Sequence, residues 1–174
     1  YGGRMDNPVV LTLMRSLAAG GYAPLSFNWR GVGSSGGTPS GRVEDALEDY
    51  RSALGAARQQ ASVRASNSHQ PTQVLAAGYS FGAIAALATA LDDDAAVEKL
   101  VLVAPPTSML NTFDIASCEC DVQVIVGSSD SFAPVHALEA WLARSARARL
   151  DVLPDADHFF GAPFWLEKLG EIEI

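Results

Sequence analysis

The sequence predicts an α/β fold, with a mostly parallel β-sheet covered by helices on both faces. Short segments rich in Val and Leu alternate with longer helical segments along the 174 residues. Strands that are buried on both faces and joined by helices imply a parallel sheet covered on both sides. The composition, 48% apolar and 18% charged, is that of a globular protein, and the length favours one domain over residues 1–174.

Five segments are predicted to be strands because they are short, apolar and bounded by turn-forming residues. Proline follows the third of them and glycine follows the fourth. The five segments are residues 22–29, 74–77, 100–104, 122–126 and 149–153.

Helices are predicted between these strands. The first begins after Asp6 or Asn7 as N-cap, has Pro8 in its first turn and ends at two glycines. Two polar, glycine- or proline-containing stretches, residues 30–41 and 62–72, are predicted to be loops. The further helices are expected within residues 43–58, 81–91, 135–146 and 159–169.

Charge and composition argue against several functional classes. Acidic residues outnumber basic ones by 20 to 12, and a nucleic-acid binder would be expected to carry a basic patch. The uncharged stretch 74–91 has nearly the length of a membrane span, but a glycine-containing turn interrupts it, so we expect no membrane segment. Cys118 and Cys120 are too close together for a disulfide framework, which suits a cytoplasmic protein. No metal, nucleotide or flavin motif is present, so no cofactor is expected.

A candidate nucleophile lies in the sequence Gly-Tyr-Ser-Phe-Gly at residues 78–82, which matches the pattern G-x-S-x-G. This match follows a predicted strand and opens an alanine-rich helix, whereas a second match at residues 33–37 lies inside a glycine-rich loop. A serine on a sharp strand-to-helix turn exposes its hydroxyl, and the next N–H, that of Phe81, can stabilise an oxyanion at the helix N-terminus. Ser80 is therefore predicted to be a nucleophile rather than an ordinary helix cap.

A serine nucleophile needs a base and an orienting carboxylate. Of the three histidines, His158 follows the last predicted strand, at the edge where parallel sheets gather their sites; His69 lies in a polar loop and His136 near a helix start. Asp130 follows the strand before it. Asp155 and Asp157 are rivals for the acid, although we expect them to hold the loop instead.

These motifs resemble those of the α/β-hydrolase superfamily, in particular its small, lidless bacterial members. The resemblance implies a catalytic triad of Ser80, Asp130 and His158. It also implies an oxyanion hole formed by the Phe81 amide and an amide among Tyr1, Gly2 and Gly3. The segments that carry the likeness are residues 1–7, 27–36, 78–82, 127–130 and 155–160, which together span nearly the whole chain.

The sequence departs from the family at its start. In the family, the oxyanion loop follows a central strand, whereas here it opens the chain, so the domain is expected to be incomplete at its N-terminus. The missing strand would lie between residues 22–29 and 74–77. We therefore expect a gap beside residues 22–29, or upstream residues filling it, and poor folding of the chain alone. Residues 105–119 are too few for a substantial cap over the site.

The predicted function is hydrolysis of a small carboxylic ester or thioester through an acyl-enzyme on Ser80, as in carboxylesterases. A peptidase or acyltransferase using the same triad, and a non-catalytic protein that kept the fold, are the alternatives. The sequence predicts neither an oligomeric state nor a substrate-binding residue. Six apolar side chains can wall an acyl pocket or equally belong to the core: Phe81, Met109, Phe159, Phe160, Phe164 and Trp165.

Overall fold

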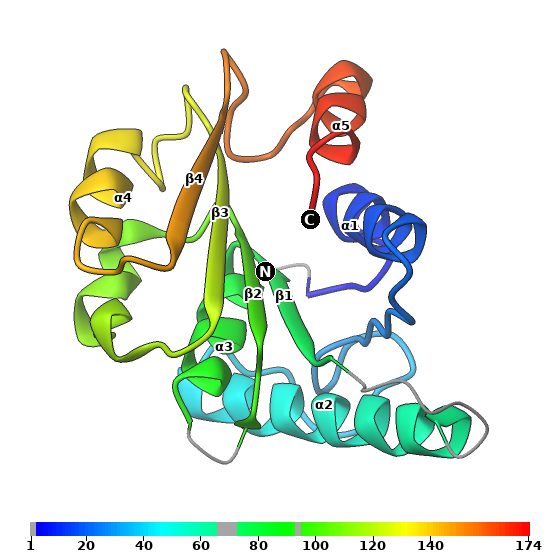
Figure 1. Cartoon of the computed structure of the whole chain (residues 1–174). Coiled ribbons are helices and arrows are strands. Elements are labelled where there is room, and N and C mark those ends of the chain that lie inside the picture. The colour runs from blue at the N-terminus through cyan, green and yellow to red at the C-terminus, as the bar shows by residue number, and fades with distance from the viewer. Residues whose placement is uncertain (1–2, 66–72, 93–94) are drawn as a thin grey trace.

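The computed structural model describes residues 3–65, 73–92 and 95–174, and these contain one parallel four-stranded sheet (Figure 1). Neighbouring strands pair in chain order, with Tyr79 of the first opposite Val103 of the second. The α/β class predicted from the apolar segments is confirmed. The strands are β1 (Leu75–Tyr79), β2 (Lys99–Val103), β3 (Asp121–Gly127) and β4 (Ala148–Leu153).

Helices cover both faces of the sheet, as predicted. Figure 1 shows α3 and α4 on one face and α1 with α5 on the other, while α2 runs along α3. In α1, Pro8 occupies the first position and the Asn7 side chain accepts a hydrogen bond from the Val9 N–H at 2.9 Å, as the sequence predicts. The helices are α1 (Pro8–Ala19), α2 (Val43–Ala65), α3 (Phe81–Ala90), α4 (Val135–Leu142) and α5 (Pro163–Gly170).

The core consists of two apolar clusters, one on each face of the sheet. Leu100 and Leu102 of β2 point into the cluster beneath α3 and α4, while Val101 and Val103 point into the cluster beneath α1 and α5. Successive strand residues alternate between faces. Because both faces are covered there, β2 is apolar on both faces from Leu100 to Val103.

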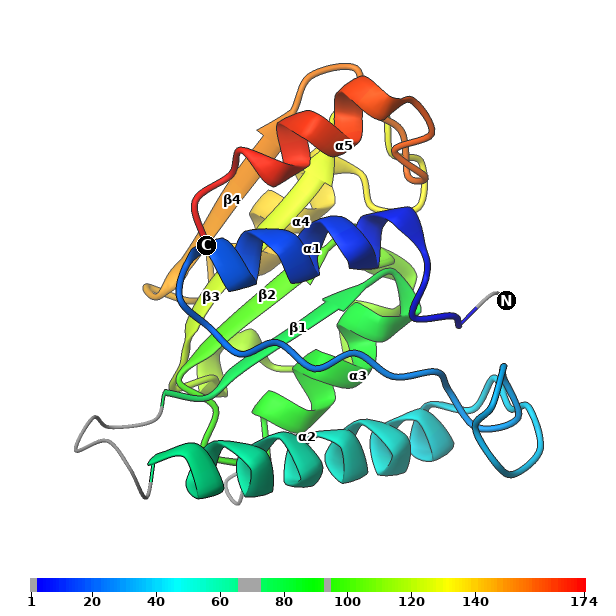
Figure 2. The same cartoon turned by 90° about the vertical axis from the view of Figure 1, so that its right-hand side faces the viewer.

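The prediction of a strand at residues 22–29 is wrong. This segment runs past β1 without joining the sheet (Figures 1 and 2), and among the described residues β1 forms a ladder with β2 alone. Its aromatic residues pack side chain to side chain instead: the Phe27 ring lies 4.8 Å from that of Trp29 and 5.9 Å from that of Tyr50. Their apolar pattern therefore reflects ring packing rather than strand pairing.

The Tyr50 hydroxyl occupies the free edge of β1. It donates to the Ala77 carbonyl at 2.8 Å and accepts from the Ala77 N–H at 2.9 Å. Burial raises the pKa of the Tyr50 hydroxyl well above its usual value. A side chain of α2 thus satisfies two backbone groups that a neighbouring strand would otherwise bind.

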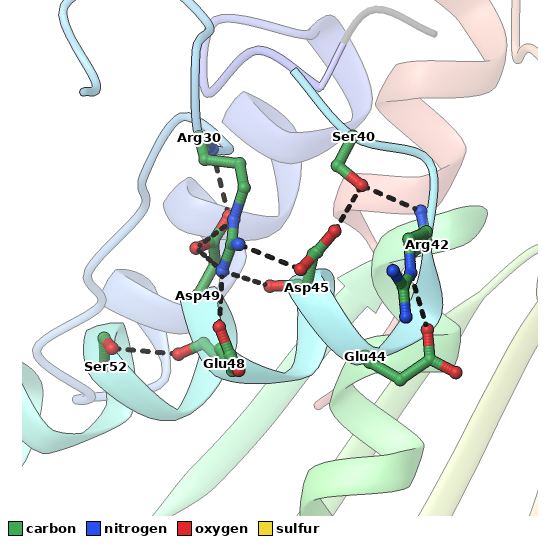
Figure 3. Close-up of polar contacts among 8 residues, drawn as sticks. All are labelled: Arg30, Ser40, Arg42, Glu44, Asp45, Glu48, Asp49 and Ser52. Carbon is green, nitrogen blue, oxygen red and sulfur yellow. Dashed lines mark hydrogen bonds and ion pairs between the residues drawn. The ribbon is translucent and has the colours of Figure 1, made fainter. Parts of the chain in front are cut away.

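Arg30 joins the glycine-rich loop to α2 (Figure 3). Its guanidinium donates from Nε to Asp49, from Nη1 to Asp45 and from Nη2 to Glu48, each at 3.0 Å. Hydrogen bonds to Asp49 and then to Glu48 raise the pKa of Arg30 further above its already high value. Because three carboxylates on one helix face share this cation, the loop is held at the start of α2.

The element boundaries differ from the predicted ones in several places. Helix α2 runs seven residues beyond residue 58 to Ala65, so residues 62–65 are helical rather than a loop, and residues 66–72, with His69, lie outside the described part. Helix α4 ends at Leu142, earlier than predicted. Residues 105–119 contain two short 3₁₀ helices, Thr107–Thr112 and Ile115–Ser117, and no cap. Within the described ranges, no helix has the length and apolar character needed to cross a bilayer.

Candidate active site

Ser80 occupies the turn between β1 and α3, in an unusual backbone conformation. Its φ of 53° and ψ of −119° are sparsely populated for a residue with a side chain. The Ser80 N–H donates to the Val103 carbonyl at 2.9 Å, and the Ser80 carbonyl accepts from Ala83 at 2.9 Å. These bonds hold the strained residue between the end of β2 and the first turn of α3.

Gly78 makes this turn sterically possible. A Cβ atom at that position would lie 2.1 Å from the carbonyl oxygen of Gly82, far inside contact distance. At Gly82 the corresponding atom would meet nothing nearer than the Trp29 ring at 3.9 Å. The tight turn therefore depends on the missing Cβ of Gly78 and not on that of Gly82.

Asp130 and His158 lie in the loops that follow β3 and β4, and the backbones of these loops touch. The Ser129 N–H donates to the Ala156 carbonyl at 2.9 Å, and the Asp155 N–H donates to the Ser128 hydroxyl at 2.8 Å. At Gly127 a Cβ atom would lie 2.1 Å from the Ala156 oxygen. The contact between the two loops thus depends on the bare backbone of Gly127.

The structure brings Ser80, His158 and Asp130 into one hydrogen-bonded chain. The Ser80 Oγ lies 3.0 Å from the His158 Nε2, and the His158 Nδ1 lies 2.8 Å from the Asp130 Oδ2. Asp130 and His158 are both buried. The other carboxylate oxygen of Asp130 accepts from the N–H groups of Phe132 at 2.8 Å and Ala133 at 2.9 Å. Such an arrangement can hold the imidazole in one orientation and withdraw a proton from the serine hydroxyl.

The two rival acids, Asp155 and Asp157, lie in the same loop as His158. Asp157 accepts a hydrogen bond from the Phe159 N–H at 3.0 Å. Asp155 has a positive φ of 61°, and its N–H binds Ser128. Neither forms a recorded hydrogen bond with the His158 ring. His136 is an exposed residue of α4.

Tyr79 is a positioning residue that the sequence analysis did not identify. Its hydroxyl donates to the His158 carbonyl at 3.0 Å, so the residue before the serine holds the main chain of the histidine. Burial raises the pKa of Tyr79 to about 12, and the charges of Asp130 and Asp157 add to this effect. The only sequence signal is the tyrosine inside the 78–82 motif, which does not reveal its partner.

The remaining candidates are the expected oxyanion-hole residues and the serine of the second motif match. Phe81 follows Ser80 at the N-terminus of α3, where backbone N–H groups lack helical partners. The Gly3 carbonyl accepts from the Trp29 N–H at 3.2 Å, while Tyr1 and Gly2 lie outside the described residues. Ser35, from the second motif match, donates to the Asn28 carbonyl at 2.8 Å. The first match thus lies in a strand-to-helix turn and the second in a loop, as the sequence predicts.

The apolar candidates for a pocket wall have different surroundings in the structure. Phe160 is 1% exposed and belongs to the core beneath α1 and α5. Phe164 lies on α5, with its ring 4.9 Å from that of Trp165 and the Lys168 ammonium over its other side. Phe159 is 64% exposed and lies beside His158.

Comparison with known families identifies the family of this chain. A family model described as "Serine aminopeptidase, S33" matches residues 9–116, more than half of the chain. The chain belongs to this family of α/β-hydrolases. The matched residues include the strand–serine–helix turn that carries Ser80.

Relatives within this fold include bacterial proteins of similar structure. An α/β serine hydrolase homologue from Coxiella burnetii has a TM-score of 0.81 and 29% identity, covering 98% of this chain and 76% of that one. A serine hydrolase without a lid from Xanthomonas campestris has a TM-score of 0.78 and 28% identity, covering 97% and 72%. An uncharacterized protein of Rickettsia prowazekii is 27% identical over 92% of this chain and 67% of its own length.

Proposed function

We propose that the protein is a serine hydrolase that cleaves small carboxylic esters or thioesters through an acyl-enzyme on Ser80. The observation that carries this proposal is the unbroken contact from the Ser80 Oγ to the His158 Nε2 at 3.0 Å and from the His158 Nδ1 to Asp130 at 2.8 Å. A serine hydroxyl is a weak nucleophile at its own pKa and needs such a base.

Each residue has a defined role in the proposed reaction. His158 Nε2 accepts the hydroxyl proton as the Ser80 Oγ attacks the carbonyl carbon, and the Phe81 N–H donates to the resulting oxyanion. The imidazolium then gives its proton to the leaving oxygen or sulfur, and the acyl group stays on Ser80. Water, deprotonated by the same imidazole, releases the acid. Asp130 orients the ring and stabilises its charge.

Peptide hydrolysis is the second candidate, and the description of the matching family favours it. The same three residues serve either substrate class, because the tetrahedral intermediates of ester and amide cleavage share their charge distribution. Acyl transfer to an acceptor other than water is a further use of the same acyl-enzyme. Turnover of acetyl esters, acetyl thioesters and aminoacyl amides by one preparation separates these possibilities.

The decisive experiment combines covalent labelling with substrate turnover. We expect a fluorophosphonate probe to label Ser80, and Ser80→Ala to abolish labelling and lower kcat by about 10⁴-fold or more, because nucleophile and base act as a unit. His158→Ala should be equally severe. Ser35→Ala is the matched control, since that serine lies in the other motif and binds only backbone, and it should keep both readouts.

Two results would contradict the proposal. Ester hydrolysis that persists in Ser80→Ala would show that another residue is the nucleophile, and Ser35 would be tested next. A folded wild-type protein that neither reacts with the probe nor turns over any of the three substrate classes would indicate a non-catalytic member of the family.

A further inference from the structure

Two exposed phenylalanines flank the imidazole of His158. The Phe132 ring centre lies 4.7 Å from that of His158, and the Phe159 ring centre lies 5.2 Å from it. Phe132 is 54% exposed and Phe159 is 64% exposed, although 26 residues separate them from each other in sequence. Their own ring centres are 6.2 Å apart in an edge-to-face arrangement. Together they form an apolar surface, the Phe132–Phe159 pair, open to solvent beside the base.

The main chain of both residues is fixed although the rings are exposed. The Phe132 N–H donates to Asp130 at 2.8 Å, and its carbonyl accepts from the Thr107 N–H at 3.0 Å. The Phe159 N–H donates to Asp157 at 3.0 Å. Because these backbones are anchored, little main-chain freedom remains to be lost when a ligand binds to the rings.

The position of the pair relative to the proton path indicates which part of a substrate meets it. During acylation, as the tetrahedral intermediate collapses, the imidazolium must donate its proton to the leaving atom, which therefore lies within hydrogen-bond reach of Nε2. The oxyanion faces the Phe81 N–H at the start of α3 instead. Groups attached to the leaving atom extend away from the scissile carbonyl on the histidine side, where the two rings lie.

We propose that the Phe132–Phe159 pair binds the leaving group of the substrate, and that this leaving group is an apolar, preferably aromatic, alcohol or thiol. The proposal rests on the proposed hydrolase function. An aromatic leaving group is stabilised by burial and, in addition, by offset or edge-to-face contacts with another aromatic ring. Both exposed rings can provide such contacts. The acyl group, directed to the other side of the ester, is not selected by this pair.

The test compares esters that differ in one half only. Benzyl acetate and methyl acetate share an acyl group and have alcohols of similar acidity, so their ratio of kcat/KM reports binding of the leaving group rather than its reactivity. We expect the wild-type protein to prefer benzyl acetate. Phe159→Ala and Phe132→Ala should each lower that preference by about threefold to tenfold, because one ring contact is lost. Phe159→Tyr, which keeps the ring, should retain it.

Phe164→Ala is the matched control, because Phe164 is similarly exposed, at 52%, but contacts Trp165 and Lys168 on α5. It should leave the preference unchanged. A preference that survives in both Phe132→Ala and Phe159→Ala would overturn the inference. The inference would also be overturned if the two variants changed the ratio of kcat/KM for methyl phenylacetate and methyl acetate instead, since these esters differ in the acyl half.

Labelling separates failure of this inference from failure of the proposed function. A fluorophosphonate with a small methyl group needs the triad and not the pair, so the phenylalanine variants should still be labelled on Ser80. Labelling without any preference for the benzyl ester refutes the inference and leaves the hydrolase function standing. A wild-type protein that is neither labelled nor active on either ester refutes both.

Discussion

At the scale of single residues, Asp130 has two separate tasks. One carboxylate oxygen binds the His158 ring, and the other binds the N–H groups of Phe132 and Ala133. The same side chain therefore holds the His158 ring and the loop that carries Phe132. An ionised carboxylate accepts hydrogen bonds at both oxygens, and no neutral side chain of equal size does so.

Asp130→Asn should lower kcat by about 10³- to 10⁴-fold, less than Ser80→Ala. The amide can place its NH₂ against the His158 Nδ1, which favours the tautomer whose Nε2 carries the proton and cannot accept another. Steady-state kinetics on one ester measures the loss. Asp155→Asn is the matched control, because asparagine tolerates the positive φ at this position. Among the described residues, the hydrogen bond to the His158 Nδ1 comes from Asp130 and not from Asp155. If Asp155→Asn or Asp157→Asn lowers kcat more than Asp130→Asn, the acid is wrongly assigned.

Much of the site could be predicted at this scale, and the reason is local. Ser80 follows from a motif with a defined turn, and Asp130 and His158 follow from their places just after strands. Tyr79 and Ser128 could not be predicted, because their hydrogen bonds reach a backbone carbonyl and a backbone N–H in another loop. Backbone N–H and carbonyl groups have the same chemistry at every residue, so the sequence does not indicate which of them a side chain will bind.

At the scale of elements, the ends of β3 and β4 are joined by a contact between backbones. Gly127→Ala would place a Cβ 2.1 Å from the Ala156 oxygen, so one of the two loops must move. We expect a loss of about 1–3 kcal/mol in the free energy of unfolding, as for other overpacked sites. Activity should fall by up to about 10²-fold, because a shift of roughly 1 Å displaces His158 from Ser80.

Gly55→Ala is the control for this experiment. Position 55 lies in α2, and a Cβ there would meet no atom within 4 Å. Alanine should raise the free energy of unfolding by about 0.5–1 kcal/mol and leave activity as it is. Urea unfolding and ester turnover measure both proteins. A Gly127→Ala protein as stable and active as the wild type would show that the two loops are not rigidly joined.

The prediction of a strand failed at residues 22–29, which pair with no strand of the described sheet. Residues 22–29 have the apolar and aromatic content of a strand, but a strand exists only where another strand binds its backbone, and composition does not report this. In the structure, Phe27 and Trp29 find aromatic partners in Tyr50 and Phe81 instead. The four segments that did become strands pair with one another in chain order.

At the scale of the whole molecule, the free edge of the sheet depends on Tyr50. The sequence predicts a gap beside β1, and the structure places a hydroxyl there that binds both backbone groups of Ala77. Tyr50→Phe removes the hydroxyl and keeps the ring. We expect a loss of about 1–3 kcal/mol in the free energy of unfolding, since two strand groups lose their partner.

This loss should shrink at alkaline pH. The pKa of Tyr50 is raised in the folded protein, so above the ordinary value of 10.0 the unfolded chain releases the proton while the folded protein retains it. The contribution of the hydroxyl to stability is therefore complete below pH 10 and declines as the pH rises towards the folded pKa. Urea unfolding of both proteins at pH 8 and pH 11 measures this, because all other groups are shared. A difference that stays constant would contradict the assignment.

The order of the strands also has a consequence for the growing polypeptide. Ser80 is made first, Asp130 next and His158 last, 78 residues after the serine. At about 5–20 residues per second, a ribosome needs roughly 4–16 s to cover that distance. During this interval the nascent chain contains Ser80 but not the histidine whose Nε2 lies 3.0 Å from its hydroxyl in the folded protein. In the proposed reaction the serine therefore has no base until His158 has been made, and the order of synthesis sets when the chemistry can begin.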